Sequence, residues 1–62
     1  MGPSNEYELA IARIVDKLAM EGRLNPSVID EIIAALGFTP SRSECTFLVD
    51  YIRWRMNNPI VK

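Results

Sequence analysis

Two clusters of glycine and proline divide this 62-residue chain into three stretches of helical character. The first cluster runs from Gly22 to Pro26, the second runs from Gly37 to Pro40, and Asn57-Asn58-Pro59 ends the third stretch. Glycine and proline interrupt helices, because glycine is conformationally free and proline lacks a backbone N–H. Between the clusters, apolar residues recur every three or four positions, which is the spacing of a helix and not of a strand. The chain is therefore predicted to be all-α.

The predicted fold is a small antiparallel three-helix bundle with short turns. Turns of only three to five residues place consecutive helices side by side in opposite directions. Residues 1–4 are expected to be a disordered N-terminus or tag remnant, and residues 58–62 a C-terminal tail. The bundle between them spans 5–57, with helices at 5–21, 26–36 and 40–57. The start of the last helix has two solutions, with Thr39 as cap before Pro40, or with Ser41 and Glu44 as a capping box.

The first two predicted helices differ in how much of their circumference is apolar. At about 100° per residue, the helix at 5–21 has a single apolar stripe. That stripe consists of Tyr7, Ile11, Ile14, Val15 and Leu18. The helix at 26–36 is apolar over a wide arc, made of Val28, Ile29, Ile32, Ile33, Ala35 and Leu36. An arc that wide is typical of a helix packed between two neighbours.

The helix at 40–57 has two apolar stripes, which lie roughly 140° apart on a helical wheel. The aliphatic stripe consists of Cys45, Leu48, Val49, Ile52 and Met56. The aromatic stripe consists of Phe47, Tyr51 and Trp54. A polar strip separates them on one side, with Thr46, Asp50, Arg53 and Asn57. Glu44 and Arg55 lie between the stripes on the other side.

A helix of a three-helix bundle needs only one buried stripe, so the second stripe has two main interpretations. In the first, this helix is central and both stripes belong to the core. In the second, Phe47, Tyr51 and Trp54 dock onto a partner, with Arg53 and Arg55 as a polar rim, because aromatic residues and arginine dominate binding hot spots. Stacking on single-stranded nucleic acid is a third use of such a stripe.

Several kinds of chemistry are disfavoured by the composition. The chain has no histidine and one cysteine, which excludes a His-containing catalytic triad, a structural zinc site and an internal disulfide. Cys45 lies on the aliphatic stripe, where a structural thiol is expected. The three glycines are isolated, so no phosphate-binding loop is present. We therefore expect no enzymatic activity, no cofactor, no metal and no small-molecule substrate.

The expected partner is another protein, or a second copy of this chain in a homodimer. The formal net charge of −1 gives little attraction to nucleic acid, and no apolar run reaches the ~18 residues of a membrane span. The default location is the cytoplasm. The predicted role is that of a small regulator, inhibitor or accessory subunit that binds protein through the aromatic stripe.

DNA binding is the alternative. The stretch from Val28 to Ile52, with Gly37 between two helices, resembles the helix-turn-helix motif of small regulators. In that family, the start of the second helix contacts base edges in the major groove. The resemblance places Ser41, Arg42, Ser43 and Thr46 at those positions. Glu44 and Asp50 lie near the same surface and oppose contact with phosphates.

Overall fold

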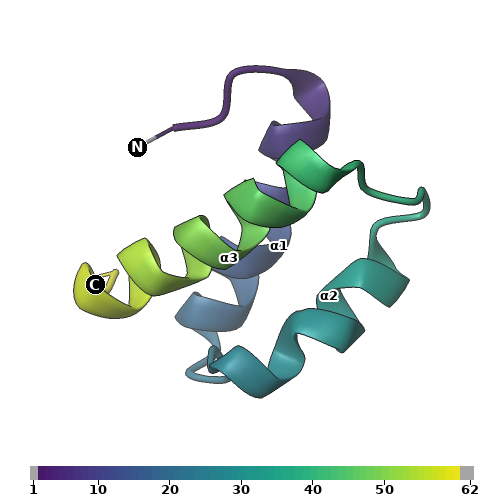
Figure 1. Cartoon of the computed structure of the whole chain (residues 1–62). Coiled ribbons are helices and arrows are strands. Elements are labelled where there is room, and N and C mark those ends of the chain that lie inside the picture. Colours follow the sequence, from purple (N-terminus) through teal and green to yellow (C-terminus); the bar gives the residue numbers. More distant parts are fainter. Residues whose placement is uncertain (1, 61–62) are drawn as a thin grey trace.

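Three helices that pack against each other form the molecule, as Figure 1 shows. The structure is a computed structural model that describes residues 2–60, so the expectations for Met1, Val61 and Lys62 lie outside it. Its elements are α1 (Glu6–Met20), a single 3-10 turn η1 (Pro26–Val28), α2 (Ile29–Ala35) and α3 (Arg42–Asn57). The described residues include no strand, which confirms the prediction of a small all-α three-helix fold.

The ends of α1 follow from local hydrogen bonds. Asn5 caps the first turn, because its Oδ1 accepts a hydrogen bond from the backbone N–H of Glu8 at 2.9 Å. Ser4, which precedes this cap, also donates to the Glu8 carboxylate through its backbone and its hydroxyl. At the other end, Gly22 adopts a φ of 71°, and the N–H of Arg23 reaches back to the carbonyl of Leu18. This pattern is a Schellman motif, and it ends α1 before the glycine.

The ends of α2 and α3 also depend on side-chain caps. Asn25 accepts a hydrogen bond from the N–H of Ser27, and the first turn after it is a 3-10 turn rather than α-helix. Of the two possible starts for α3, the structure has the capping box. Ser41 accepts from the N–H of Glu44, and the Glu44 carboxylate accepts from the N–H of Ser41 at 2.8 Å. Pro40 therefore lies before the helix.

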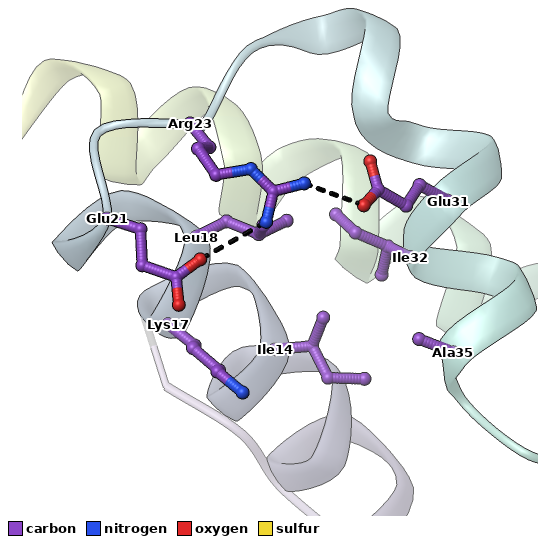
Figure 2. A pocket seen from close by; sticks show the side chains of 8 residues that line it. All are labelled: Ile14, Lys17, Leu18, Glu21, Arg23, Glu31, Ile32 and Ala35. Atoms are coloured by element: carbon purple, nitrogen blue, oxygen red, sulfur yellow. Dashed lines mark hydrogen bonds and ion pairs between the residues drawn. The ribbon is translucent and has the colours of Figure 1, made fainter.

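The turn between α1 and α2 is tied to both helices by Arg23. Its guanidinium contacts Glu21 at 3.3 Å and Glu31 of α2 at 2.9 Å, as Figure 2 shows. All three side chains are largely exposed, so water and salt screen both pairs and each adds little to stability. The two pairs orient the turn more than they stabilise the fold.

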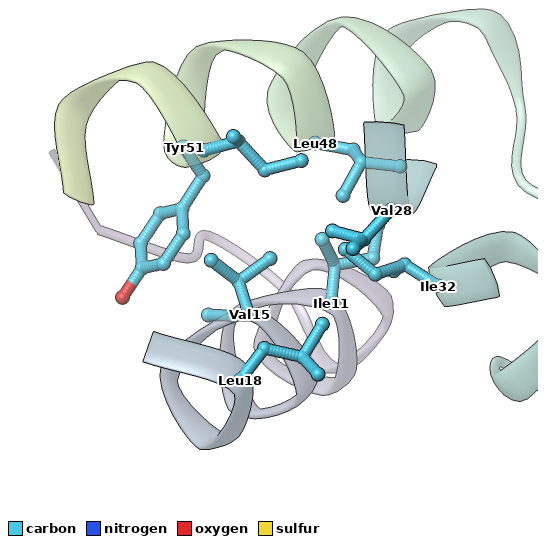
Figure 3. Close-up of a cluster of buried hydrophobic side chains, with 9 residues drawn as sticks. Ile11, Val15, Leu18, Val28, Ile32, Leu48 and Tyr51 are labelled. Atoms are coloured by element: carbon cyan, nitrogen blue, oxygen red, sulfur yellow. The ribbon is translucent and has the colours of Figure 1, made fainter. Parts of the chain in front are cut away.

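A single apolar cluster joins the three helices (Figure 3). Its buried members among the described residues are Ile11, Ala12, Val15, Leu18, Val28, Ile32, Leu48, Tyr51 and Ile52. Partly buried residues surround them, namely Ile14, Leu24, Ile29, Ile33, Leu36, Phe47 and Trp54. The core thus draws on all three predicted apolar helices.

Several residues of the predicted stripes lie nearer the surface than expected. Tyr7 is 50% exposed in the first turn of α1, where its ring packs edge-on against Phe38 at 5.2 Å. In α2, only Ile32 is fully enclosed, and Ala35 is exposed. The reason is that a helix of seven residues is too short to cover its neighbours over their whole length. The expectation that α2 is packed between neighbours over its wide apolar arc is therefore wrong.

The buried side of α3 lies between the two predicted stripes. Leu48 and Ile52 come from the aliphatic stripe, whereas Tyr51 comes from the aromatic one. In contrast, Met56 is 47% exposed, and Cys45 and Val49 are only half-buried. In Figure 3, Tyr51 lies across the cluster from Val28 and Ile32. The arrangement with α3 in the centre and both stripes fully buried is therefore wrong, because α3 buries one side that takes a part of each stripe.

Candidate docking surface on α3

The five predicted docking residues have different environments. Tyr51 is 4% exposed and belongs to the core, so its ring offers almost no surface to a partner. Phe47 and Trp54 are half-buried and pack on the edge of the core. Arg53 is exposed on the polar strip. The Arg55 side chain is only 16% exposed, which differs from the expected place in an open rim.

The structure brings four of these five side chains together. The ring centroids of Phe47 and Tyr51 are 5.4 Å apart, and those of Tyr51 and Trp54 are 5.5 Å apart. The Arg55 guanidinium carbon lies 4.4 Å from the centre of the Trp54 ring and 5.7 Å from that of Tyr51. These separations are typical of favourable aromatic pairs and of cation–π contacts.

A polar cluster between α1 and α3 fixes the base of this group. The Tyr51 hydroxyl donates to the two carboxylate oxygens of Asp16 at 3.0 and 3.1 Å, and Arg55 Nε donates to Asp16 Oδ1 at 2.9 Å. Burial raises the pKa of the Tyr51 hydroxyl; the hydrogen bond from Arg55 opposes that rise, and Asp16 adds to it. Buried or partly buried charges are stable when they are paired and hydrogen-bonded in this way.

Asp16, the residue that holds Tyr51 and Arg55, was not among the residues that the sequence singled out. It lies on α1 between Ala12 and Ala19, which are one turn away on either side along the same face. Small residues at those positions allow α3 to come close to α1, and Ala12 is buried there. Spacing along the sequence gives no signal for the pair of Asp16 and Arg55, because the two residues are 39 positions apart and lie on different helices.

We use the name docking edge for the surface formed by Phe47, Trp54 and Arg55, with Tyr51 beneath it. On α1, a shallow hollow of about 400 Å³ adjoins this edge, because Asp16 lines the hollow and also binds Tyr51 and Arg55. Met20 lines the same hollow and is 54% exposed. The docking edge and the hollow beside it therefore bring together aromatic rings, a paired arginine and an exposed methionine, which are residue types enriched in protein interfaces.

A second hollow lies between α1 and α2. Figure 2 shows its apolar walls, formed by Ile14, Leu18, Ile32 and Ala35, and its charged rim. Its volume of about 260 Å³ is below the ~300–1,000 Å³ of most small-molecule sites. Its rim carries Lys17, Glu21, Arg23 and Glu31, so positive and negative charges balance there.

The residues that the helix-turn-helix resemblance singles out all lie on the surface. Ser41, Arg42, Ser43 and Thr46 are exposed at the start of α3. Local structure already engages all three hydroxyl groups. Ser41 caps the helix, the hydroxyl oxygens of Ser41 and Ser43 are 3.2 Å apart, and Thr46 Oγ1 donates to the carbonyl of Arg42 at 3.1 Å. Arg42 is the single cation of this group, and Glu44 lies in the same turn.

Comparisons with protein-family models, with curated proteins and with solved structures give no match to this chain. Within residues 2–60, no group of three or more histidine, cysteine or acidic side chains is arranged to hold a metal ion. No helix in that range has both the length and the apolar character required to cross a bilayer. We therefore infer function from the geometry of the surfaces described above.

Proposed function

We propose that this chain is a small non-enzymatic protein that acts by binding another protein through the docking edge, as a regulator, inhibitor or accessory subunit. The observation that supports this proposal is the incomplete burial of two aromatic rings of α3. Phe47 and Trp54 pack on the edge of the core but stay half-buried. Two aromatic rings at the surface of so small a protein are well suited to anchor a partner.

The energetics of binding favour this surface over the other hollows. Tryptophan and arginine are over-represented among residues whose truncation costs more than 1–2 kcal/mol of binding free energy. Aromatic side chains also have few rotatable bonds, so they lose little conformational entropy when a partner fixes them. The hollow between α1 and α2 has aliphatic walls and no aromatic residue.

Protein is a better supported partner than nucleic acid. Non-specific binding to phosphates needs several lysine or arginine side chains on one face. The start of α3 offers Arg42 beside Glu44, and the whole chain carries a formal net charge of −1. Under the DNA-binding alternative, affinity for duplex DNA at low salt depends on Arg42 and falls steeply as salt is added.

Site-specific photo-crosslinking tests the proposal in cells that express the protein. A photoreactive phenylalanine analogue replaces Asp50, which is exposed and lies three residues after Phe47 and four before Trp54, on the same side of α3. The matched control carries the analogue at Met56, which is also exposed but lies on the aliphatic stripe.

We expect one defined adduct from position 50 and none from position 56. The partner is then identified from the mass of the adduct. If the adduct is a second copy of this chain, light scattering gives about twice the mass of 7.0 kDa, and the docking edge forms a homodimer. Equal crosslinking from positions 50 and 56 contradicts the proposal, because it means that contact is not confined to the docking edge.

A further inference from the structure

Arg55 is held at three points although it lies near the end of α3. Its Nε donates to Asp16 at 2.9 Å, one terminal nitrogen donates to the carbonyl of Asn58 at 3.1 Å, and the other donates to the Tyr51 hydroxyl at 3.2 Å. The contacts come from both α1 and α3, so they fix the position and the tilt of the guanidinium plane. An exposed arginine on a helix surface normally samples many rotamers, which is the entropy that a surface ion pair must overcome.

The guanidinium that is fixed in this way covers the Trp54 ring. Its central carbon lies 4.4 Å from the ring centre, and the Tyr51 ring lies 5.5 Å away. A planar guanidinium stacks on an aromatic face, whereas the ammonium of lysine is a compact charge that cannot match the plane. Asn58 closes the group, because its side chain donates to the carbonyl of Trp54 at 2.7 Å.

We propose that Arg55 is a positioning residue: the Asp16–Arg55 pair holds the Trp54 indole in one orientation before any partner binds. This inference rests on the proposed function, since a fixed indole matters only if the docking edge binds a protein. The ring then need not be ordered on binding, and the cost of ordering an aromatic side chain lies at the low end of the ~0.5–1.5 kcal/mol that longer side chains cost. Loss of the pair therefore weakens binding about two- to threefold.

A role of Arg55 as a rim charge alone predicts a different effect of lysine at position 55 than a positioning role does. A rim charge acts through long-range attraction, so lysine at position 55 replaces it almost fully. A positioning role requires the planar stack and the three hydrogen bonds, so lysine does not replace it. The variant Arg55→Lys separates the two roles, and Arg53→Lys is the matched control on the neighbouring exposed arginine.

The test uses the isolated protein and its single tryptophan. Nitrogen-15 relaxation gives an order parameter for the indole N–H of Trp54 and, in the same experiment, for every backbone amide. We expect the indole value of the wild type and of Arg53→Lys to be near the ~0.85 of rigid backbone. In Arg55→Lys, we expect the indole value to fall below about 0.6 while the backbone amides of α3 stay rigid.

Two results overturn the proposal. If the indole of Arg55→Lys is as ordered as that of the wild type, the stack does not hold the ring. If the indole and the α3 amides lose order together, Arg55 maintains the helix and not the orientation of Trp54. Because no partner is present, neither result depends on whether the docking edge binds protein, and a failure of the crosslinking experiment leaves the result of this test unchanged.

Discussion

The contact between α1 and α3 at Tyr51 gives the sharpest prediction about stability. Tyr51→Phe removes one oxygen atom and keeps the ring that packs in the core. That oxygen donates to the Asp16 carboxylate at 3.0 and 3.1 Å and accepts from Arg55 at 3.2 Å. The substitution therefore tests the polar cluster without opening a cavity among the apolar residues.

The expected loss follows from the environment of the three groups. A hydrogen bond to a charged group contributes ~1.5–3 kcal/mol when it is well shielded from water. The side chains of Asp16 and Arg55 are 34% and 16% exposed, so water replaces part of what the hydroxyl provided. We therefore expect a loss of ~1–2 kcal/mol in the free energy of unfolding, which lowers Tm by about 4–16 °C in a domain of this size.

The measurement is thermal and urea unfolding at pH 7, followed by far-ultraviolet circular dichroism. Tyr7→Phe is the matched control, because Tyr7 is 50% exposed and its ring contact with Phe38 survives the substitution. The control is expected to change stability by no more than ~0.5 kcal/mol. If Tyr51→Phe and Tyr7→Phe lose the same amount, the cluster of Asp16, Tyr51 and Arg55 does not stabilise the packing of α1 on α3.

Two further predictions concern the same core. Burial raises the pKa of Tyr51 above its usual value of ~10, so the stability that the neutral hydroxyl gives is complete below pH ~10 and is lost as pH rises through the higher folded pKa. Urea titrations from pH 8 to 11 are expected to show a steeper loss for the wild type than for Tyr51→Phe, and parallel curves would refute this. Ile32 is fully buried, so Ile32→Val is expected to lower the free energy of unfolding by ~0.5–1.5 kcal/mol. The measurement is a lower midpoint of urea unfolding with an unchanged slope. An unchanged midpoint would mean that α2 is not anchored through this residue.

The fold was predictable because local signals agreed with each other. Glycine at positions 22 and 37 has positive φ in the structure, at the two places where the helical pattern stops. The capping box of Ser41 and Glu44 was readable as one of two starts for α3. The apolar positions Ile11, Val15 and Ile32 are buried as their spacing indicated. These features depend on neighbours close in the sequence, so the sequence alone carries them.

The docking surface was less predictable because it depends on contacts between helices. A helical wheel placed Arg55 at the border of two apolar stripes, and nothing within α3 indicated that Asp16 would pair with it. The burial of Tyr51 follows from the direction in which α3 packs on α1, which the turn lengths do not determine. Of the three aromatic residues, Tyr51 therefore became core, and Phe47 and Trp54 remained half-buried at the surface.

The most direct test of the account is the affinity of alanine variants for the partner captured by crosslinking from position 50. Trp54→Ala removes one of the two surface rings of the docking edge, whereas Met56→Ala removes an exposed apolar side chain of the same helix outside that edge. We predict that Trp54→Ala weakens binding by more than ~1 kcal/mol, about fivefold or more, with its helicity intact, and that Met56→Ala changes it less than about twofold. Equal affinities for the two variants would contradict the claim that this chain binds protein through the docking edge.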